Sequence, residues 1–316
     1  MKYKVIITTS PHVKSVLTVD KVMRGVIIAL IPAIFMSVYF YGLRSVKVLS
    51  ISILACVLTE VLFQKIRNRP FTILDQSAVV TGLLFALILP PSIPIGAVIL
   101  GSIFTIIVGK GLFGGLGSNI FNPALLGRAF LMATFPVFMT SWIKPFAADA
   151  VSAATPLGLS KFNGIITGYH DLFLGNTAGS LGEASAIAVL IGGIYMLWKG
   201  FADWRVPLSM FIAVFISGQA AHIVNPDNPS GLFHLLAGGF MLGALFMATD
   251  PVTTPVTKSG RWIFGAGAGI LTIVIRVWGG LPEGVMYSIL LMNALTPIIN
   301  RHTRPRCFGS AVKVAA

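Results

Sequence analysis

The sequence has few charged residues, and this scarcity decides the class of protein. Only 10% of its 316 residues are charged and 55% are hydrophobic, whereas a soluble domain carries roughly 25% charged residues. Apolar runs of about 20 residues recur, and such a run crosses the hydrocarbon core of a bilayer as a helix. The alternating segments of about ten residues that build a transmembrane barrel are absent. The composition therefore predicts an all-α integral membrane protein.

Cysteine and the usual catalytic motifs are also scarce. The two cysteines, Cys56 in an apolar run and Cys307 in the basic tail, are not expected to form a disulfide or to hold an iron–sulfur cluster by themselves. No His/Cys spacing indicates zinc, and no Ser/His/Asp or paired-carboxylate pattern indicates a hydrolase. The glycine-rich stretch 109–117 lacks the order of a phosphate-binding loop. We expect no metal site and no stand-alone catalytic residue.

The net charge of +13 indicates membrane topology and not a nucleic-acid partner, because basic residues mark the cytoplasmic ends of membrane helices. We expect residues 1–21 to stay as a cytoplasmic segment, since no cleavage site follows a short apolar core. With the N-terminus inside, ten predicted spans place 18 of the 23 Lys and Arg residues on the cytoplasmic side. Both termini are then cytoplasmic and the loop 143–184 faces outward. The predicted spans are 22–42, 48–64, 71–90, 94–111, 120–142, 185–199, 206–224, 232–249, 261–278 and 283–300.

The sequence contains an internal repeat. The string Gly-Leu-Leu-Phe at 82–85, followed by prolines at 90 and 94, recurs 161 positions later as Gly-Ala-Leu-Phe at 243–246, followed by prolines at 251 and 255. Five spans per half is an odd number, so the second copy would be inverted, an arrangement that places a ligand or ion pathway between the halves. The predicted organisation is two five-helix repeats, 22–142 and 185–300, and a cytoplasmic basic tail, 301–316.

Two asparagines follow the glycine-rich stretch 109–117. We expect that stretch to form a re-entrant or half-helix segment that lines a buried ligand, although a turn between packed helices fits equally well. Asn119 and Asn122 are three positions apart, so on a helix they share a face. Their amides could bind the imide edge of a flavin. Hydrogen bonding between helices is the favoured alternative.

Three acidic residues lie within the apolar field, where ionisable groups point to function. Asp75 and Asp250 are candidates for an ion path. Each has a structural alternative, Asp75 as a helix cap and Asp250 as the end of a helix before a proline. For Glu60 a salt bridge with Lys65 or Arg67 is the favoured interpretation. The histidines are expected at the membrane interface or at helix ends.

The long loop carries a motif with a specific chemistry. The string Asp149-Ala150-Val151-Ser152-Ala153-Ala154-Thr155 resembles the acceptor site at which a flavin transferase esterifies FMN onto a threonine hydroxyl. Asp149, Ser152, Ala154 and Thr155 fit that pattern. Alanine stands at 150 and 153, where the acceptor site usually has glycine. In this resemblance Thr155 is a covalent anchor and Asp149 serves recognition by the transferase.

Several separated strings resemble the family formed by the D subunits of Rnf electron-transport complexes and the related B subunits of sodium-pumping NADH:quinone oxidoreductases. They extend from residue 10 to residue 309, so the resemblance covers nearly the whole chain. The long N-terminal extension expected of the quinone-reducing branch is missing, which favours the Rnf branch. The strings are Ser10-Pro11-His12, Asp75-Gln76-Ser77-Ala78 with Thr81-Gly82-Leu83-Leu84 and Pro90-Pro91, Asn119-Ile120-Phe121-Asn122-Pro123-Ala124-Leu125 with Gly127-Arg128-Ala129-Phe130, Met247-Ala248-Thr249-Asp250-Pro251-Val252, and Arg304-Pro305-Arg306 with Phe308-Gly309.

The resemblance implies a cofactor set, an activity and partners. It implies a urea-transporter-like fold of two inverted five-helix halves. It implies FMN joined by a phosphodiester to Thr155. It also makes Asn119 and Asn122 candidates to bind a non-covalent riboflavin, which is found in the quinone-reducing branch. It implies membership of an ion-translocating ferredoxin:NAD+ oxidoreductase in a bacterial or archaeal cytoplasmic membrane. The chain would pass electrons and contribute to Na+ or H+ translocation. Its partners would be the A, B, C, E and G subunits, the flavin transferase and membrane lipid.

Other functions stay open at this point. A small-solute channel or transporter of the same inverted architecture would explain the repeat but not the string 149–155. The B subunit of a quinone reductase would need a quinone pocket that the sequence does not locate. A structural scaffold would carry no flavin. No motif distinguishes Na+ from H+ or sets the direction of electron flow.

Overall fold

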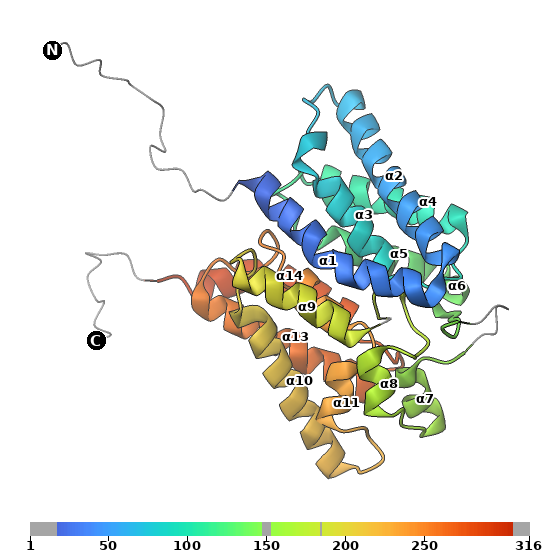
Figure 1. The fold of residues 1–316 in the computed structure, drawn as a ribbon. Coiled ribbons are helices and arrows are strands. Elements are labelled where there is room, and N and C mark those ends of the chain that lie inside the picture. The colour runs from blue at the N-terminus through green and yellow to red at the C-terminus, as the bar shows by residue number, and fades with distance from the viewer. Residues whose placement is uncertain (1–17, 147–152, 184, 306–316) are drawn as a thin grey trace, which may run out of the picture.

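The computed structural model describes residues 18–146, 153–183 and 185–305, and every regular element in these ranges is a helix (Figure 1). The predicted all-helical class is therefore confirmed. Within these ranges four helices are long and apolar enough to cross a membrane, and three shorter apolar helical segments accompany them. The long helices are α1 (Val19–Tyr41), α2 (Leu43–Ile66), α10 (Arg205–Val224) and α13 (Lys258–Trp278). The shorter segments are α3 (Ser77–Leu87), Ile95–Gly111 and α9 (Ala186–Trp198).

The first half of the chain runs from α1 to α6. Gly42 alone joins α1 to α2, and its φ of +58° is one that glycine adopts readily. The segment 120–142 is not one continuous helix as predicted, because Pro136 cannot donate a helix hydrogen bond and two helices form there. The remaining elements of this half are the 3₁₀ turn η1 (Ile73–Asp75), α4 (Ile95–Ile106), the π-helical turn η2 (Ile107–Gly111), α5 (Pro123–Thr134) and α6 (Pro136–Thr140).

The second half begins in the segment predicted as a loop, which contains two short helices, α7 (Pro156–Asn163) and α8 (Tyr169–Leu174). The segment 232–249 is not one continuous helix as predicted, because α11 stops at Leu236, before Gly238, whose φ is +69°. Helical structure resumes at Phe240, so this part of the chain is a broken helix. The other elements are the 3₁₀ turn η3 (Leu181–Glu183), α11 (Gly231–Leu236), α12 (Phe240–Leu242), the π-helical turn η4 (Gly243–Met247) and α14 (Val285–His302).

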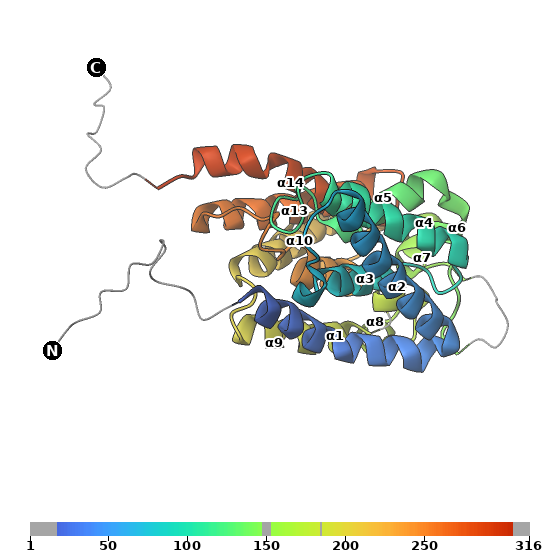
Figure 2. The ribbon, with the colours of Figure 1, turned by 90° about the horizontal axis from the view of Figure 1, so that it is seen from above.

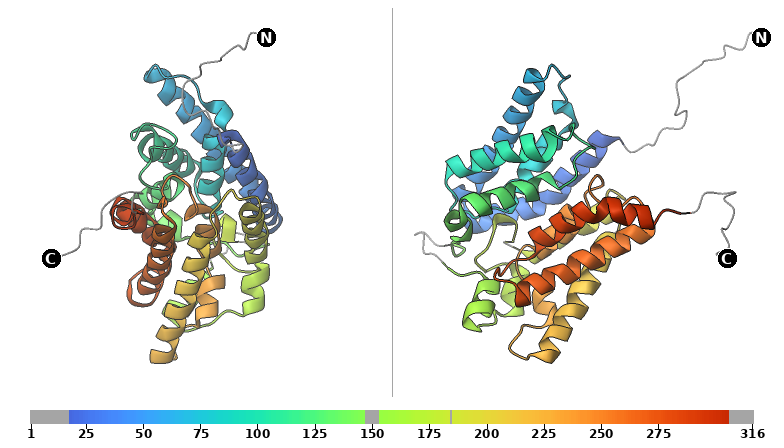
Figure 3. Two further views of the ribbon diagram at one scale, coloured as in Figure 1. Left: turned by 90° about the vertical axis from the view of Figure 1, so that its left-hand side faces the viewer. Right: turned by 180° about the vertical axis from the view of Figure 1, so that it is seen from behind.

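Small residues let the helices approach closely. α1 lies along α9, where a Cβ on Gly192 would stand 1.9 Å from the carbonyl oxygen of Ala29. α2 packs on α3, where a Cβ on Gly82 would stand 2.9 Å from the Cα of Ile53. Glycine at helix contacts is the usual device of membrane proteins. Figure 3 shows α1–α6 and α9–α14 as two neighbouring groups of helices.

The two ends of the molecule differ in what they carry. The start of α1 and the end of α14 lie at one end, whereas α6 and α7 lie at the other (Figure 2). Thr155, which immediately precedes α7, is therefore at the end opposite the start of α1.

Candidate functional site

A cavity of about 80 Å³ lies between the two halves of the chain. Its walls come from α1, α3, the loop before α5, and η4 with the turn that follows it. Three predicted site residues line this inner cavity, namely Asn119, Asn122 and Asp250. At ~30 Å³ per water the space suits two or three water molecules. A flavin ring enters it only if the walls move apart.

The two asparagines do not share a helix face, so that prediction is wrong, because both lie in the loop before α5. Asn122 is the N-cap of α5, and its Oδ1 accepts the N–H groups of Ala124 and Leu125 at 3.1 Å and 3.3 Å. Its Nδ2 donates to the carbonyl oxygen of Met247 at 3.3 Å. Asn122 thereby ties the first half of the chain to the second.

Asp250 lies in the turn after η4, and its carboxylate accepts several hydrogen bonds. One oxygen accepts the N–H of Val252 at 3.1 Å and the other accepts the hydroxyl of Thr253 at 3.3 Å. A side-chain hydrogen bond also joins it to Asn119, whose amide donates to the carbonyl oxygen of Phe121 at 3.2 Å. Asp250 thus stabilises its turn and faces the inner cavity at the same time.

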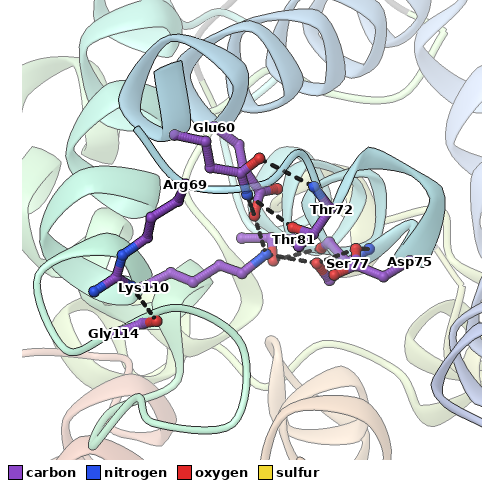
Figure 4. Close-up of polar contacts among 9 residues, drawn as sticks. Glu60, Arg69, Thr72, Asp75, Ser77, Thr81, Lys110 and Gly114 are labelled. Atoms are coloured by element: carbon purple, nitrogen blue, oxygen red, sulfur yellow. Dashed lines mark hydrogen bonds and ion pairs between the residues drawn. The ribbon is translucent and has the colours of Figure 1, made fainter. Parts of the chain in front are cut away.

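A buried polar network connects α2, η2 and the start of α3 (Figure 4). The Nζ of Lys110 lies 2.6 Å from Oε1 of Glu60 and 2.5 Å from Oγ of Ser77. Ser77 in turn donates its hydroxyl and its N–H to Oδ1 of Asp75, at 2.6 Å and 2.8 Å. Asp75 therefore accepts the first N–H of α3 from the position before Gln76, the N-cap residue, which makes no side-chain cap hydrogen bond itself. The lysine and glutamate side chains are 4% and 7% exposed, so the pair is almost completely desolvated.

The salt bridge predicted for Glu60 is wrong. Lys65 and Arg67 lie at the exposed end of α2, and the guanidinium of Arg67 stacks over the ring of Phe63. Glu60 instead faces α4 and meets Lys110, 50 residues further along the chain. The spacing along α2 predicts a partner for Glu60 within the same helix. The partner instead comes from a separate helical segment that packs against α2.

A second cavity, of about 580 Å³, opens beside this network at the end of the molecule where α1 begins. We call it the vestibule. Arg69 lies at the vestibule and donates to the carbonyl oxygen of Gly114 at 2.9 Å. Asp75 lines the vestibule and Asp250 lines the inner cavity, whereas Lys110 lines both. The two predicted ion-path carboxylates therefore lie in separate cavities with a buried ammonium between them.

Thr155 is the N-cap of α7. Its Oγ1 accepts the N–H of Gly158 at 3.1 Å, and the residue is only 6% exposed. Ala154 is exposed beside it. Asp149 and Ser152 of the predicted acceptor string lie outside the described residues.

Helix α7 borders a third cavity, of about 620 Å³, which no pattern in the sequence indicates. Lys161, His234 and Arg276 line it from α7, α11 and α13. His234, predicted to lie at the membrane interface or at a helix end, stands in the last turn of α11. It is 2% exposed and has no hydrogen-bond partner on either ring nitrogen among the described residues. Arg276 donates to the carbonyl oxygens of His234 at 2.6 Å and Ala237 at 3.0 Å. This outer cavity is therefore rich in hydrogen-bond donors.

Lys161 fastens α7 to the end of α13. Its Nζ donates to the carbonyl oxygens of Arg276 at 2.9 Å and Leu281 at 3.1 Å, and also to that of Gly279. Burial lowers the pKa of Lys161. The three carbonyl groups satisfy the ammonium donors and hold α7 in place.

Further ion pairs lie outside these cavities or between the halves. Arg128 on α5 pairs with Glu283 in front of α14, and so joins the two halves of the chain. Asp203, in the turn between α9 and α10, contacts both Arg205, at 2.9 Å, and Arg261. Burial raises the pKa of Asp203, but hydrogen bonds from the Arg205 N–H and the Arg261 guanidinium outweigh it and hold that pKa below its ordinary value. In the described ranges no three His, Cys, Asp or Glu side chains are grouped to hold a metal ion.

Comparison with known proteins gives one consistent result. Residues 6–309 match the model of the NQR2, RnfD, RnfE family. The chain is 45% identical over 320 residues to the D subunit of the proton-translocating ferredoxin:NAD(+) oxidoreductase complex of Clostridium ljungdahlii, with 96% of each chain covered. It is 43% identical over 307 residues to the D subunit of the Na(+)-translocating ferredoxin:NAD(+) oxidoreductase complex of Acetobacterium woodii, covering 96% of this chain and 95% of that one. It is 34% identical over 345 residues to the D subunit of the ion-translocating oxidoreductase complex of Escherichia coli, covering 96% and 98%.

Proposed function

The chain belongs to the NQR2, RnfD, RnfE family, and on that premise we propose that it is the D subunit of an ion-translocating ferredoxin:NAD+ oxidoreductase complex. The observation that carries this is the near-complete coverage of two relatives named as that subunit, at 45% and 43% identity. The chain is then a multi-pass subunit in a bacterial membrane, with the other subunits of the complex as its partners. Activity belongs to the assembled complex.

We further propose ten spans in two inverted repeats. The order of elements supports this, because a helix pair followed by a broken or short helix and two further helices occurs twice, as α1 to α5 and as α9 to α14. Equivalent neighbours also touch in each half: α2 contacts α3 and α4, and α10 contacts α11 and α13. With the basic ends of the helices in the cytoplasm, the start of α1 is cytoplasmic and Thr155 faces outward.

We propose that Thr155 carries FMN through a phosphodiester. The acceptor string supports this, and so does the position of the hydroxyl at the start of α7, where the helix N-terminus favours a phosphate. The ester oxygen keeps lone pairs with which to accept the N–H of Gly158. The outer cavity along α7 has a volume of about 620 Å³. His234 and Arg276 line it with nitrogen atoms that have no hydrogen-bond partner among the described residues. This volume and these nitrogen atoms fit a flavin. When bound, a flavin exchanges one or two electrons with other carriers.

The second flavin remains a separate proposal. Asn119 and Asn122 are the candidates for a non-covalent riboflavin, and both face the inner cavity. Because that cavity suits only a few waters, binding there requires the loop before α5 to shift. A purified complex with two flavins per copy of this chain, one of them released on denaturation, would support this site.

The covalent flavin is tested by in-gel fluorescence of the denatured complex, produced together with a flavin transferase. Thr155→Asn is the informative variant, because asparagine is as good an N-cap as threonine but has no hydroxyl to esterify. We expect a fluorescent wild-type band and a dark Thr155→Asn band. Thr167→Val, in the same segment, serves as the matched control and should stay fluorescent.

The opposite result has a clear meaning. A dark wild-type band, with the transferase active on another substrate, would refute the covalent flavin at Thr155 but would leave the assignment to the family unchanged. Fluorescence that persists in Thr155→Asn would place the flavin on another residue.

A further inference from the structure

Lys110 occupies an unusual position for a basic residue. It lies in the π-helical turn η2 at the end of α4, and π-helical turns inside helices often mark functional sites. Its backbone is held tightly, since a Cβ on Gly109 would stand 2.9 Å from the Cα of Pro123 and one on Gly111 would stand 2.7 Å from the Phe63 ring. The four-carbon stem of the lysine is therefore the part that is free to move.

The ammonium of Lys110 stands between two cavities that contain carboxylates. Figure 4 shows it reaching toward Glu60 and Ser77, with Asp75 behind the serine. The vestibule lies on one side and the inner cavity, which contains Asp250, lies on the other. Lys110 and Leu116 line both cavities, so the ammonium stands where the two cavities adjoin.

The Lys110–Glu60 pair is incomplete as a purely structural ion pair. Oε2 of Glu60 is buried and has no hydrogen-bond partner among the described residues. A buried ion pair stabilises a fold only when its remaining lone pairs are also satisfied. Glu60 and Asp75 supply two carboxylates, Lys110 supplies an ammonium within the network, and the Arg69 guanidinium lies at the vestibule beside it.

We propose that Lys110 is the gate between the vestibule and the inner cavity, and that a monovalent cation opens it by competing for Glu60. A proton would neutralise the carboxylate, and a sodium ion would take the place of the ammonium at the Glu60 and Ser77 oxygens. In either case Lys110 loses its attraction to Glu60 and turns toward Asp250. The gate rests on the ion-translocating part of the proposed function.

The test uses the whole complex in proteoliposomes. Passive cation entry is measured without an electron donor, once with a sodium gradient at constant pH and once with a pH gradient in sodium-free buffer. Lys110→Met removes the gate charge. Lys110→Met/Glu60→Gln removes both charges, so no unpaired buried charge remains to prevent folding. Lys110→Arg keeps the charge, and Lys65→Met, at the exposed end of α2, is the matched control.

We expect Lys110→Met and the double variant to leak cations at least about tenfold faster than wild type, because a positive charge that repels the passing ion has gone. Lys110→Arg and Lys65→Met should leak at the wild-type rate. Donor-driven NAD+ reduction and flavin fluorescence should persist in all four, while the ions moved per electron fall in the first two. The gradient that leaks identifies the cation as Na+ or H+.

Two results would overturn the gate. If Lys110→Met/Glu60→Gln assembles and leaks cations at the wild-type rate, the Lys110–Glu60 pair is only structural, whatever the leak rate of Lys110→Met. If the wild-type complex reduces NAD+ but moves neither ion, the gate and the ion-translocating part of the proposed function both fail. Loss of fluorescence in wild type would instead count against the flavin at Thr155 and leaves the leak measurement intact.

Discussion

At the scale of single residues, this chain places several of its few charges in closely matched contacts. Glu60 meets Lys110, Arg128 meets Glu283, and Lys161 meets three carbonyl groups. Removing one member of a buried pair costs about 3–5 kcal/mol, because the other charge is left without compensation. Variants that neutralise both members of a pair therefore report on function more cleanly than single substitutions.

Asp203 gives a pH-dependent prediction at this scale. Its pKa is lower in the folded protein than in the unfolded chain, so its stabilising effect is present above about pH 4, the ordinary carboxyl range, and is lost as the pH falls through the lowered pKa. Asp203→Asn should lower the thermal unfolding midpoint of the purified complex at pH 7. The difference from wild type should shrink in acid. A difference that is the same at pH 7 and in acid would show that the two arginine contacts contribute nothing through charge.

Sequence reasoning identified some of these residues and missed others for a physical reason. Asp75, Asn122 and Asp250 are conspicuous because polar groups in an apolar field are costly, and the latter two do meet at one cavity. Lys110 stands in the glycine-rich stretch 109–117, where no neighbouring residue in the sequence indicates a partner, yet it is buried. Its pairing with Glu60 depends on how α2 and α4 are rotated against each other, and no local period encodes that rotation.

At the scale of elements, the breaks in the helices matter as much as the helices. Hydropathy locates apolar runs correctly, but it does not respond to Pro136 or Gly238, where predicted spans divide. The sequence does contain a Gly-Gly pair at 238–239, where the helix breaks. It could not be told from ordinary helix-packing glycine, which membrane helices use freely.

Gly238 gives a prediction for this scale. Its φ is +69°, and a Cβ there would stand 2.6 Å from Cδ1 of Leu157 on α7. Gly238→Ala should therefore destabilise the protein by about 1–3 kcal/mol through backbone strain and crowding. Gly280→Ala is the control, because nothing lies within 4 Å of a Cβ at that position. Equal unfolding midpoints for the two variants would show that the break between α11 and α12 tolerates a side chain.

At the scale of the whole molecule, the two halves meet through few but specific contacts. The α1–α9 packing, the hydrogen bond from Asn122 to Met247 and the Arg128–Glu283 pair all cross between them. The inner cavity lies at the same boundary. Repeat symmetry in the sequence predicted that a pathway would lie between the halves. It could not predict that the two carboxylates would face separate cavities.

Ion coupling gives the prediction for this scale. Asp75→Asn and Asp250→Asn should each reduce the ions moved per NAD+ reduced to near background, because each removes the acidic group of one cavity, while the flavin fluorescence persists. Asp171→Asn, on an exposed part of α8, should leave transport unchanged. Full coupling in both variants would remove these two residues from the ion path and confine Asp75 to its hydrogen bonds with Ser77.

The burial of Thr155 constrains the order of events in biogenesis. Thr155 is 6% exposed and its hydroxyl is engaged as an N-cap, so the hydroxyl cannot enter the active site of another enzyme while α7 is packed. If Thr155 carries the flavin, the transferase must act on the newly exported segment before α7 docks. Attachment of the flavin then competes in time with the docking of α7. A chain in which α7 docks before the transferase acts stays without flavin, so the abundance of the transferase during synthesis sets the share of complexes that carry the flavin.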